Sequence, residues 1–273
     1  MDEIVISMYL NDGVGAQTIS RKLEIGIHRV YKILKKNNIT IRDHKHKNTR
    51  RATLNDNFFS KIDTQERAYI IGFIAADGTI IKMKQASAYV KIDLRAKDED
   101  ILQKIKDSLN STRTITHYMS ASSYFIEPRP ISRLILTGDN LVHDLEVIGI
   151  TQRKSNTLGS FSGVIPFPLM RHFIRGYFDG DGSWKGNGQD IAWSILGTKE
   201  LCIDIASHMI KEGLVSRIPT LYKRKPHQTV VSLEYGGRKQ CKRIAEWLYK
   251  DSIIHLDRKF EKAKLHLCLD LIN

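Results

Sequence analysis

The sequence predicts an α+β protein in which two similar, pseudo-symmetric halves, each with the element order αββαββ, follow a small all-α module. Three observations predict this. An apolar phrase ending in Asp-Gly occurs twice, segments of alternating polarity follow each copy, and three short helical segments precede the first copy. The aspartates that end the phrases are 104 positions apart, a spacing that fits a duplicated fold. We expect an N-terminal module at residues 1–38, a basic linker at 39–64, and halves at 65–160 and 161–273.

The N-terminal module has the apolar spacing of three short helices, at residues 3–11, 16–23 and 27–36. A tight turn at residues 24–26 precedes the last of them, as in a helix-turn-helix. The expected apolar core comprises Ile19, Leu23, Val30 and Leu34, and the third helix exposes the basic side chains His28, Arg29, Lys32 and Lys35. This pattern favours a DNA-binding helix-turn-helix over a three-helix unit that serves only for packing.

Basic charge is concentrated near the N-terminus. The chain has 43 basic and 30 acidic residues, a net charge of +13, which favours a polyanionic partner. Residues 40–52 have no periodicity and contain five basic side chains: Arg42, Lys45, Lys47, Arg50 and Arg51. Such a tract is commonly a solvated linker. Beside a helix-turn-helix, we expect it to follow phosphates or to lie in a minor groove.

Each half is expected to begin with the helix formed by its apolar phrase. In the first half we predict strands at residues 79–83 and 88–95, a helix at 98–109, strands at 113–119 and 131–137, and a helix at 140–147. In the second half the corresponding segments are a strand at Trp184, a strand at 191–196, a helix at 199–211, strands at 217–223 and 229–235, and a helix at 239–249. Asp98 has the position of an N-cap for the helix that follows it.

The two phrases have the same internal pattern. Residues 70–78 read IIGFIAADG and residues 174–182 read IRGYFDGDG, so each has two small residues four positions apart, then Asp and Gly. Residues four apart share one face of a helix, and small residues there allow two helices to approach closely. We expect the final glycines, Gly78 and Gly182, to end the helices in the left-handed conformation.

Close packing of these helices would bring Asp77 and Asp181 together at their C-terminal ends. The helix dipole disfavours negative charge there, and the two carboxylates repel each other. A bridging divalent cation removes that repulsion, and hard oxygen ligands suit Mg²⁺. The backbone carbonyls of Ala76 and Gly180 are candidates for further ligands. A single helix that ends in Asp-Gly is common and usually has only a structural role. Two copies with the same residues at the same positions favour a metal site.

Both phrases resemble the LAGLIDADG motif of the homing endonucleases in its two-motif, single-chain form, over roughly residues 65–270. The family's metal-binding acid is at the eighth motif position, which is Asp77 in one copy and Asp181 in the other. The sixth position, often acidic in the family, is Ala75 in the first copy and Asp179 in the second. The resemblance implies a saddle of two sheets over DNA, two or three Mg²⁺ ions, and cleavage of a long asymmetric site across the minor groove.

A second duplicated pair follows the last helix of each half. Arg153 and Lys154 come after the first half, and Arg258 and Lys259 come after the second. Family members place a basic residue near each cleavage site, where it can polarise water or stabilise charge on the phosphate. We therefore expect Lys154 and Lys259 to be catalytic, together with Asp77 and Asp181.

Strand alternation leaves one face of each sheet free to contact DNA. The candidate contacts on that face are Lys82, Lys84, Lys91, Arg95, Arg113, Arg133, Lys185, Arg217, Lys223 and Lys225. The resulting hypothesis is a metal-dependent endonuclease that cuts both strands of double-stranded DNA and acts as a monomer. Two alternatives remain open: an RNA-splicing maturase, with RNA as its partner, and a catalytically silent DNA-binding regulator on the same scaffold.

The cysteines and the apolar segments of the sequence indicate the cellular compartment of the protein. Cys202, Cys241 and Cys268 lack metal-binding spacing, and we expect buried or half-buried thiols in a reducing compartment. Because the first residues are neither basic nor strongly apolar, we expect no export signal, and no apolar stretch has membrane-spanning length. We expect an intracellular protein of the cytoplasm, nucleoid or an organelle matrix, with no membrane partner.

Overall fold

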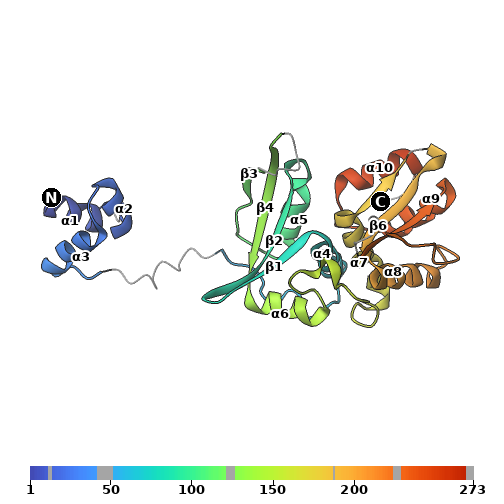
Figure 1. Cartoon of the computed structure of the whole chain (residues 1–273), viewed down its shortest axis with the longest axis horizontal. Coiled ribbons are helices and arrows are strands. Elements are labelled where there is room, and N and C mark those ends of the chain that lie inside the picture. The colour runs from blue at the N-terminus through green and yellow to red at the C-terminus, as the bar shows by residue number, and fades with distance from the viewer. Residues whose placement is uncertain (12–13, 42–51, 121–126, 187, 224–228, 269–273) are drawn as a thin grey trace. The chain divides into compact units, whose positions relative to one another are not determined.

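The computed structural model describes residues 1–11, 14–41, 52–120, 127–186, 188–223 and 229–268. The chain divides into two compact units, Met1–Arg51 and Ala52–Asn273 (Figure 1). The first unit contains the three predicted helices, and the second contains both predicted halves. The finer boundaries expected near residues 38, 64 and 160 remain predictions.

The N-terminal unit consists of α1 (Asp2–Leu10), α2 (Ala16–Lys22) and α3 (Ile27–Lys36). Val5, Ile19, Val30 and Leu34 are fully buried between them. The turn before α3 is fixed by Ser20, whose hydroxyl donates to the carbonyl oxygen of Ile25 at 2.7 Å. The four basic side chains expected to be exposed on α3 are exposed. The assignment of this unit as a helix-turn-helix stays a prediction.

The second unit has the predicted α+β architecture with two corresponding halves. The first half comprises α4 (Gln65–Asp77), β1 (Gly78–Met83), β2 (Ala86–Arg95), α5 (Glu99–Ser108), β3 (Thr116–Ser120), β4 (Arg129–Thr137) and α6 (Asp139–Ile148). The second comprises α7 (Met170–Asp181), β5 (Gly182–Lys185), β6 (Ala192–Thr198), α8 (Lys199–Lys211), β7 (Tyr222–Lys223), β8 (Val230–Gly236) and α9 (Arg238–Tyr249), followed by α10 (Asp257–Leu267). The sheets have the corresponding antiparallel orders β1-β2-β4-β3 and β5-β6-β8-β7, which confirms the predicted duplication of the fold.

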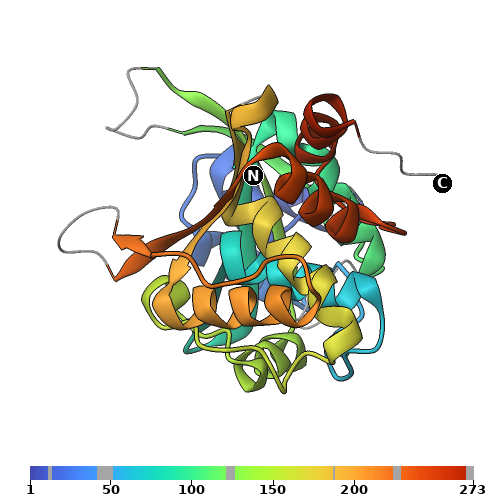
Figure 2. The same cartoon turned by 90° about the vertical axis from the view of Figure 1, so that its right-hand side faces the viewer.

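Each sheet buries one face and leaves the other, here called the open face, without a covering layer of its own helices. In the first sheet Val90 and Ile92 of β2 are fully buried, whereas Lys91 and Asp93 point to the open face. Antiparallel register places Arg133 of β4 opposite Asp93 on that face. In the second sheet Trp193 and Leu233 are buried in the core, while the open face includes Lys185 and Glu234. Figure 2 shows this second half in front, with α8 in orange and the C-terminal helices in red.

The structure corrects several local predictions. Gly78 and Gly182 are extended, with φ of −72° and −100°, because each helix passes directly into a strand. A Cβ at these positions would lie 2.7 Å from Ile74 and 2.2 Å from Phe178, so close approach explains why both are glycine. Asp98 makes no side-chain cap and accepts instead from Arg258.

Two further expectations are corrected at the edges of the second half. The strand expected at residues 217–223 is reduced to Tyr222–Lys223. Cys202 and Cys241 are buried as expected, but Cys268 is exposed because it follows the end of α10. Within the described part of the chain, every helix is too short or too polar to cross a membrane.

Candidate functional site

The centre of the second unit is the packed pair of helices α4 and α7 (Figure 1). A Cβ added to Gly72 would lie 2.0 Å from the carbonyl oxygen of Phe173 in α7, and one added to Gly176 would lie 1.9 Å from that of Tyr69 in α4. Near the C-terminal ends, a Cβ on Gly180 would lie 2.3 Å from the Cβ of Ala76. The contacts are reciprocal, as expected of two helices related by a pseudo-twofold axis. The predicted stripe of small residues is therefore the contact surface of the helices.

This packing brings Asp77 and Asp181 together as the last residues of α4 and α7. The position of a Cβ on Gly180, the residue before Asp181, lies 3.1 Å from Oδ2 of Asp77. Burial, together with the negative charge of Asp181, raises the pKa of Asp77 to about 6. Burial also raises the pKa of Asp181. The two carboxyl groups thus share one electrostatic environment in which a second negative charge is disfavoured.

The two predicted lysines lie at the same helix ends. Nζ of Lys154 donates to the carbonyl oxygen of Ala76 at 2.9 Å. Nζ of Lys259 donates to the carbonyl oxygens of Phe178 (2.5 Å), Asp179 (2.7 Å) and Gly182 (2.6 Å), with Gly180 at 3.4 Å. Only 6 % of Lys154 and 5 % of Lys259 is exposed. Each ammonium group therefore caps the C-terminal carbonyls of the helix that carries an aspartate.

The charges of the lysines and aspartates are coupled. Burial lowers the pKa of Lys259 to about 8, and the nearby carboxylates of Asp179, Asp77 and Asp181 oppose this shift. Burial lowers the pKa of Lys154 as well, and the two aspartates at the helix ends oppose it. In turn, both lysines lower the pKa values of both aspartates against the effect of burial. The site is a compact group of two acids and two bases at the junction of the halves.

The donor set at this junction fits a hard divalent cation. Two partly accessible carboxylates supply oxygen ligands, and the carbonyl oxygens of Ala76 and Gly180 lie at the same ends. These carbonyls already accept hydrogen bonds from the lysines, but each has a second lone pair. In the described residues, no group of three or more His, Cys, Asp and Glu side chains is arranged to hold a metal ion. Any ion here would complete its coordination with water, backbone or a ligand.

Open space reaches Asp77 from two sides. A pocket of about 640 Å³ is lined by Asp77, Thr79, Arg153 and Lys154, among others. A second pocket of about 380 Å³ is lined by Asp77, Arg95, Asp98 and Arg258. Arg153 and Lys154 therefore border Asp77 on one side and Arg258 borders it on the other. Arg258 and Lys259 were expected to follow the last helix of their half, but they lie within a further helix, α10. Both pockets combine acidic and basic groups, which suits a metal-bound phosphate.

On the open face of the first sheet, the basic side chains are largely paired. Arg133 makes two hydrogen bonds to Asp93, at 2.6 and 2.9 Å, and its guanidinium group lies 4.5 Å from the ring centroid of Tyr118. Lys91 lies 3.4 Å from the same carboxylate. Arg95 is exposed at the end of β2. Arg113 is exposed before β3 and not on it, because the strand predicted at residues 113–119 begins at Thr116. Sequence reasoning identified the basic residues of this face but not the carboxylate that holds two of them.

The second sheet repeats this arrangement. Lys185 forms an ion pair with Glu234 across the open face. A pocket of about 580 Å³ next to it is lined by Arg217, Tyr222 and Ser232, among others. Each open face thus places an acidic side chain, Asp93 or Glu234, beside basic ones.

The structure corrects two of the candidate contacts. Lys82 points to α6, where it pairs with Glu146 at 2.7 Å, because the strand alternates and Ile80 of the same face is buried. Lys223 is exposed but is in register with buried Val231, so Tyr222 and not Lys223 shares the open face. Lys84 is exposed beyond the end of β1. Lys225 and the linker residues Arg42, Lys45, Lys47, Arg50 and Arg51 lie outside the described residues.

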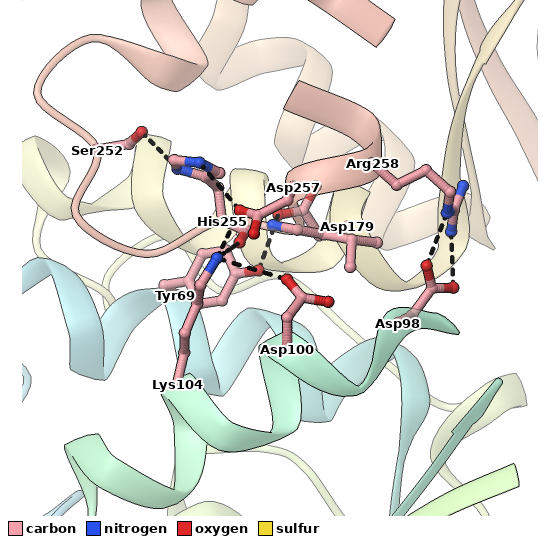
Figure 3. A network of polar contacts seen from close by, with 10 residues as sticks. Tyr69, Asp98, Asp100, Lys104, Asp179, Ser252, His255, Asp257 and Arg258 are labelled. Carbon is pink, nitrogen blue, oxygen red and sulfur yellow. Dashed lines mark hydrogen bonds and ion pairs between the residues drawn. The ribbon is translucent and has the colours of Figure 1, made fainter. Parts of the chain in front are cut away.

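A buried polar network that sequence reasoning did not predict lies beside the acid pair (Figure 3). Oδ2 of Asp179 accepts from the hydroxyl of Tyr69 and from the backbone N–H of Leu256, both at 2.8 Å. Burial raises the pKa of Asp179 to about 6. On the surface of the same region, Arg258 makes two hydrogen bonds to Asp98 of the first half, at 2.8 and 3.1 Å. The one available signal was the acidic sixth position in the second motif alone.

Comparison with known proteins identifies part of the chain. Residues 64–149 match the family model of the LAGLIDADG-like domain. No curated protein matches the sequence. Among solved structures, mesophilic variants of the homing endonuclease I-DmoI are 13 % identical over 78 % of this chain and 100 % of theirs, with a TM-score of 0.47. The homing endonuclease I-WcaI, bound to its DNA recognition sequence, is 11 % identical over 78 % of this chain and 92 % of its own, with a TM-score of 0.49.

Proposed function

Since residues 64–149 match the family model of the LAGLIDADG-like domain, we propose that this protein is a site-specific, divalent-metal-dependent endonuclease of double-stranded DNA. It hydrolyses one phosphodiester bond on each strand of a long, asymmetric site. The single observation that carries the proposal is the meeting of Asp77 and Asp181 at the ends of two helices whose backbones are in contact. A purely structural helix pair has no need of two mutually repelling acids at this point.

The acid pair is the proposed metal site. Its carboxylates are hard ligands, and the raised pKa of Asp77 indicates that a positive charge between the groups would be favourable. We propose Mg²⁺ as the ion, with the backbone carbonyls of Ala76 and Gly180 as further ligands. When bound, such an ion activates water and stabilises negative charge on phosphate oxygens.

The remaining steps belong to the protein's own groups. Asp77 and Asp181 would hold the metal charge beside the two reacting phosphates at the junction of the halves, one aspartate for each strand. Lys154 and Lys259 add positive charge beside them and help to stabilise charge developing on the phosphate. Because both ammonium groups already hold helix-end carbonyls, they are fixed in position before DNA binds.

The open faces of the two sheets are the proposed contact surface for DNA. Arg95, Arg113 and Arg217 contribute charge without a carboxylate partner in the described residues, whereas Lys91, Arg133 and Lys185 are oriented by Asp93 or Glu234. Oriented basic groups suit contacts with base edges, and free ones suit phosphates. We further propose that the N-terminal unit binds adjacent DNA through α3, and that the basic linker follows the phosphate backbone. The two halves differ in these side chains, which suits an asymmetric site.

The test is a cleavage assay on a supercoiled plasmid that carries the gene's own insertion site, with and without Mg²⁺. Wild-type protein is expected to linearise the plasmid only with the metal. Asp77→Asn and Asp181→Asn are expected to lose double-strand cleavage and to retain binding in a gel-shift assay. Asp190→Asn, which changes an exposed acid outside the site, is the matched control and is expected to cut normally.

Three outcomes contradict the proposal in different ways. Cleavage by both motif variants would refute the metal assignment. Binding of the plasmid site without cleavage by the wild type would favour the silent regulator. Selective binding of an intron RNA over duplex DNA would favour the maturase.

A further inference from the structure

The two halves hold their lysine-bearing segments in different ways. In the second half, the backbone N–H of Leu256, three residues before Lys259, donates to the buried carboxylate of Asp179. Leu256 is also the N-cap of α10, and its carbonyl oxygen accepts from the backbone N–H of Lys259 at 3.0 Å. Asp179 therefore fixes the start of the helix from which Lys259 reaches the end of α7.

Side chains of the first half hold the same segment from the other side. The hydroxyl of Tyr69 donates to Oδ2 of Asp179, so α4 fixes the carboxylate. Nζ of Lys104 in α5 donates to the carbonyl oxygen of His255 at 3.1 Å and to Asp257 at 2.5 Å. Figure 3 shows these groups converging on residues 255–258 between α5 and α7. We call this set of contacts the clasp.

The first half has no corresponding clasp among the described residues. The motif spacing of 104 residues aligns Asp179 with Ala75 of the first half and Tyr69 with Phe173 of the second. Neither Ala75 nor Phe173 has a side chain that can form a hydrogen bond, so the first half lacks both the acceptor and the donor. No side chain of the described residues hydrogen-bonds to the backbone of residues 149–153, which precede Lys154. Lys154 itself donates to one carbonyl, whereas Lys259 donates to several. The halves share a fold but not the means of positioning their lysines.

We propose that Asp179 is a positioning residue that holds Lys259 through Leu256, so that the two cleavage centres are unequal and loss of Asp179 impairs only one of them. This inference rests on the proposed function for its consequence in cleavage. The geometry itself is independent of it. Displacing a reacting or positioning group by about 1 Å can lower the rate of the step it serves by about 100-fold.

The test compares Asp179→Ala, which copies the residue of the first motif, with Asp179→Asn, which keeps an oxygen acceptor for both donors. On a duplex site with different labels on the two strands, Asp179→Ala is expected to slow cleavage of one strand about 10- to 100-fold and the other less than about threefold. Nicked product then accumulates. In Asp179→Asn, the two strands are expected to be cleaved at rates close to those of the wild type.

A second measurement uses metal-free protein without DNA. Amide hydrogen exchange at Leu256 is expected to be about tenfold or more faster in Asp179→Ala than in wild type, because its charge-assisted acceptor is removed. The matched control is Asp204→Ala. Asp204 is also a buried carboxylate. It accepts hydrogen bonds from the hydroxyl of Ser162 and from the backbone N–H groups of Ser162 and Phe161. Its loss is expected to leave exchange at Leu256 and the ratio of strand cleavage unchanged.

If Asp179→Ala fails to fold, Tyr69→Phe takes its place, since it removes one of the two donors to Asp179 and should shift both readouts in the same direction by a smaller factor. Equal slowing of both strands, or unchanged exchange at Leu256, would overturn the inference. If wild-type protein cuts neither strand, the proposed function fails, and the exchange measurement alone then decides whether Asp179 positions the segment.

Discussion

The contact between α4 and α7 leaves no space for a side chain at Gly176, and Gly176→Ala tests this directly. The added Cβ would lie 1.9 Å from the carbonyl oxygen of Tyr69, whereas real Cβ atoms essentially never come within 3.0 Å of a heavy atom in a different part of the chain. The helices must therefore separate locally by about 1.1 Å. Both sides of the contact are helix backbone, so no flexible side chain can relieve it.

The magnitude follows from two opposing effects. In an ordinary helix, replacing Gly by Ala stabilises by about 1 kcal/mol. Overpacking against a fixed neighbour costs about 1–3 kcal/mol, and a backbone-to-backbone clash is at the upper end of that range. We expect a net loss of about 2 kcal/mol in the free energy of unfolding, equivalent to a decrease in Tm of about 4–8 °C for a unit of this size.

Urea unfolding followed by tryptophan fluorescence is the assay. All three tryptophans, Trp184, Trp193 and Trp247, lie in the second unit, so the signal reports on that unit alone. Gly236→Ala is the matched control, because a Cβ there would meet nothing within 4 Å, and its stability is expected to change by less than about 0.5 kcal/mol. Equal or greater stability of Gly176→Ala would refute the close packing of the helix pair.

Three other perturbations address the charges of the site and its surroundings. Because the pKa of Asp77 is raised to about 6, mainly by burial, the metal-free folded protein binds this proton more tightly than the unfolded chain, and stability falls as the pH rises from about 4 to about 6. Asp77→Asn should therefore stabilise metal-free protein by about 3 kcal/mol near pH 8 and by little near pH 4. Urea unfolding at the two pH values measures this, and a loss of stability at both would contradict it. Asp93→Asn removes the carboxylate that pairs with Arg133 and Lys91, so the affinity for nonspecific DNA should rise about fivefold and its salt dependence should steepen. Fluorescence anisotropy measures both. Unchanged affinity would mean that Asp93 does not restrain the two basic side chains. Neutralising Arg50 and Arg51 should weaken DNA binding and reduce the log-log salt slope by up to ~0.9 for each lost phosphate contact, and an unaltered slope would remove the linker from the interface.

The repeated elements of this fold were predictable from sequence because they repeat. Duplicated small residues and aspartates predicted the helix pair, and alternating polarity at residues 88–95 predicted the buried and open faces of β2. Motif spacing also led to Lys154 and Lys259, which lie at the predicted helix ends. Their roles in chemistry remain proposals.

The features that sequence reasoning missed depend on contacts between distant segments. Asp98 looks like a helix cap in its local sequence, but Arg258, 160 residues away, binds its carboxylate. Likewise, the sequence alone could not identify Asp93 and Glu234 as the partners of Arg133 and Lys185, because the register between strands determines which charged side chains pair. Gly78 and Gly182 were predicted to be left-handed because Gly after a helix usually is, but here the helix continues directly into a strand.

The account depends most on a cation held jointly by the two motif aspartates. Its most direct test is a Mn²⁺ titration followed by electron paramagnetic resonance, with and without the duplex site, for wild type, Asp77→Asn, Asp181→Asn and the double variant. We expect each single change to weaken the tightest binding by about tenfold or more, and the double variant to bind no more tightly than either. Wild-type affinity in the double variant would show that these carboxylates do not hold the ion.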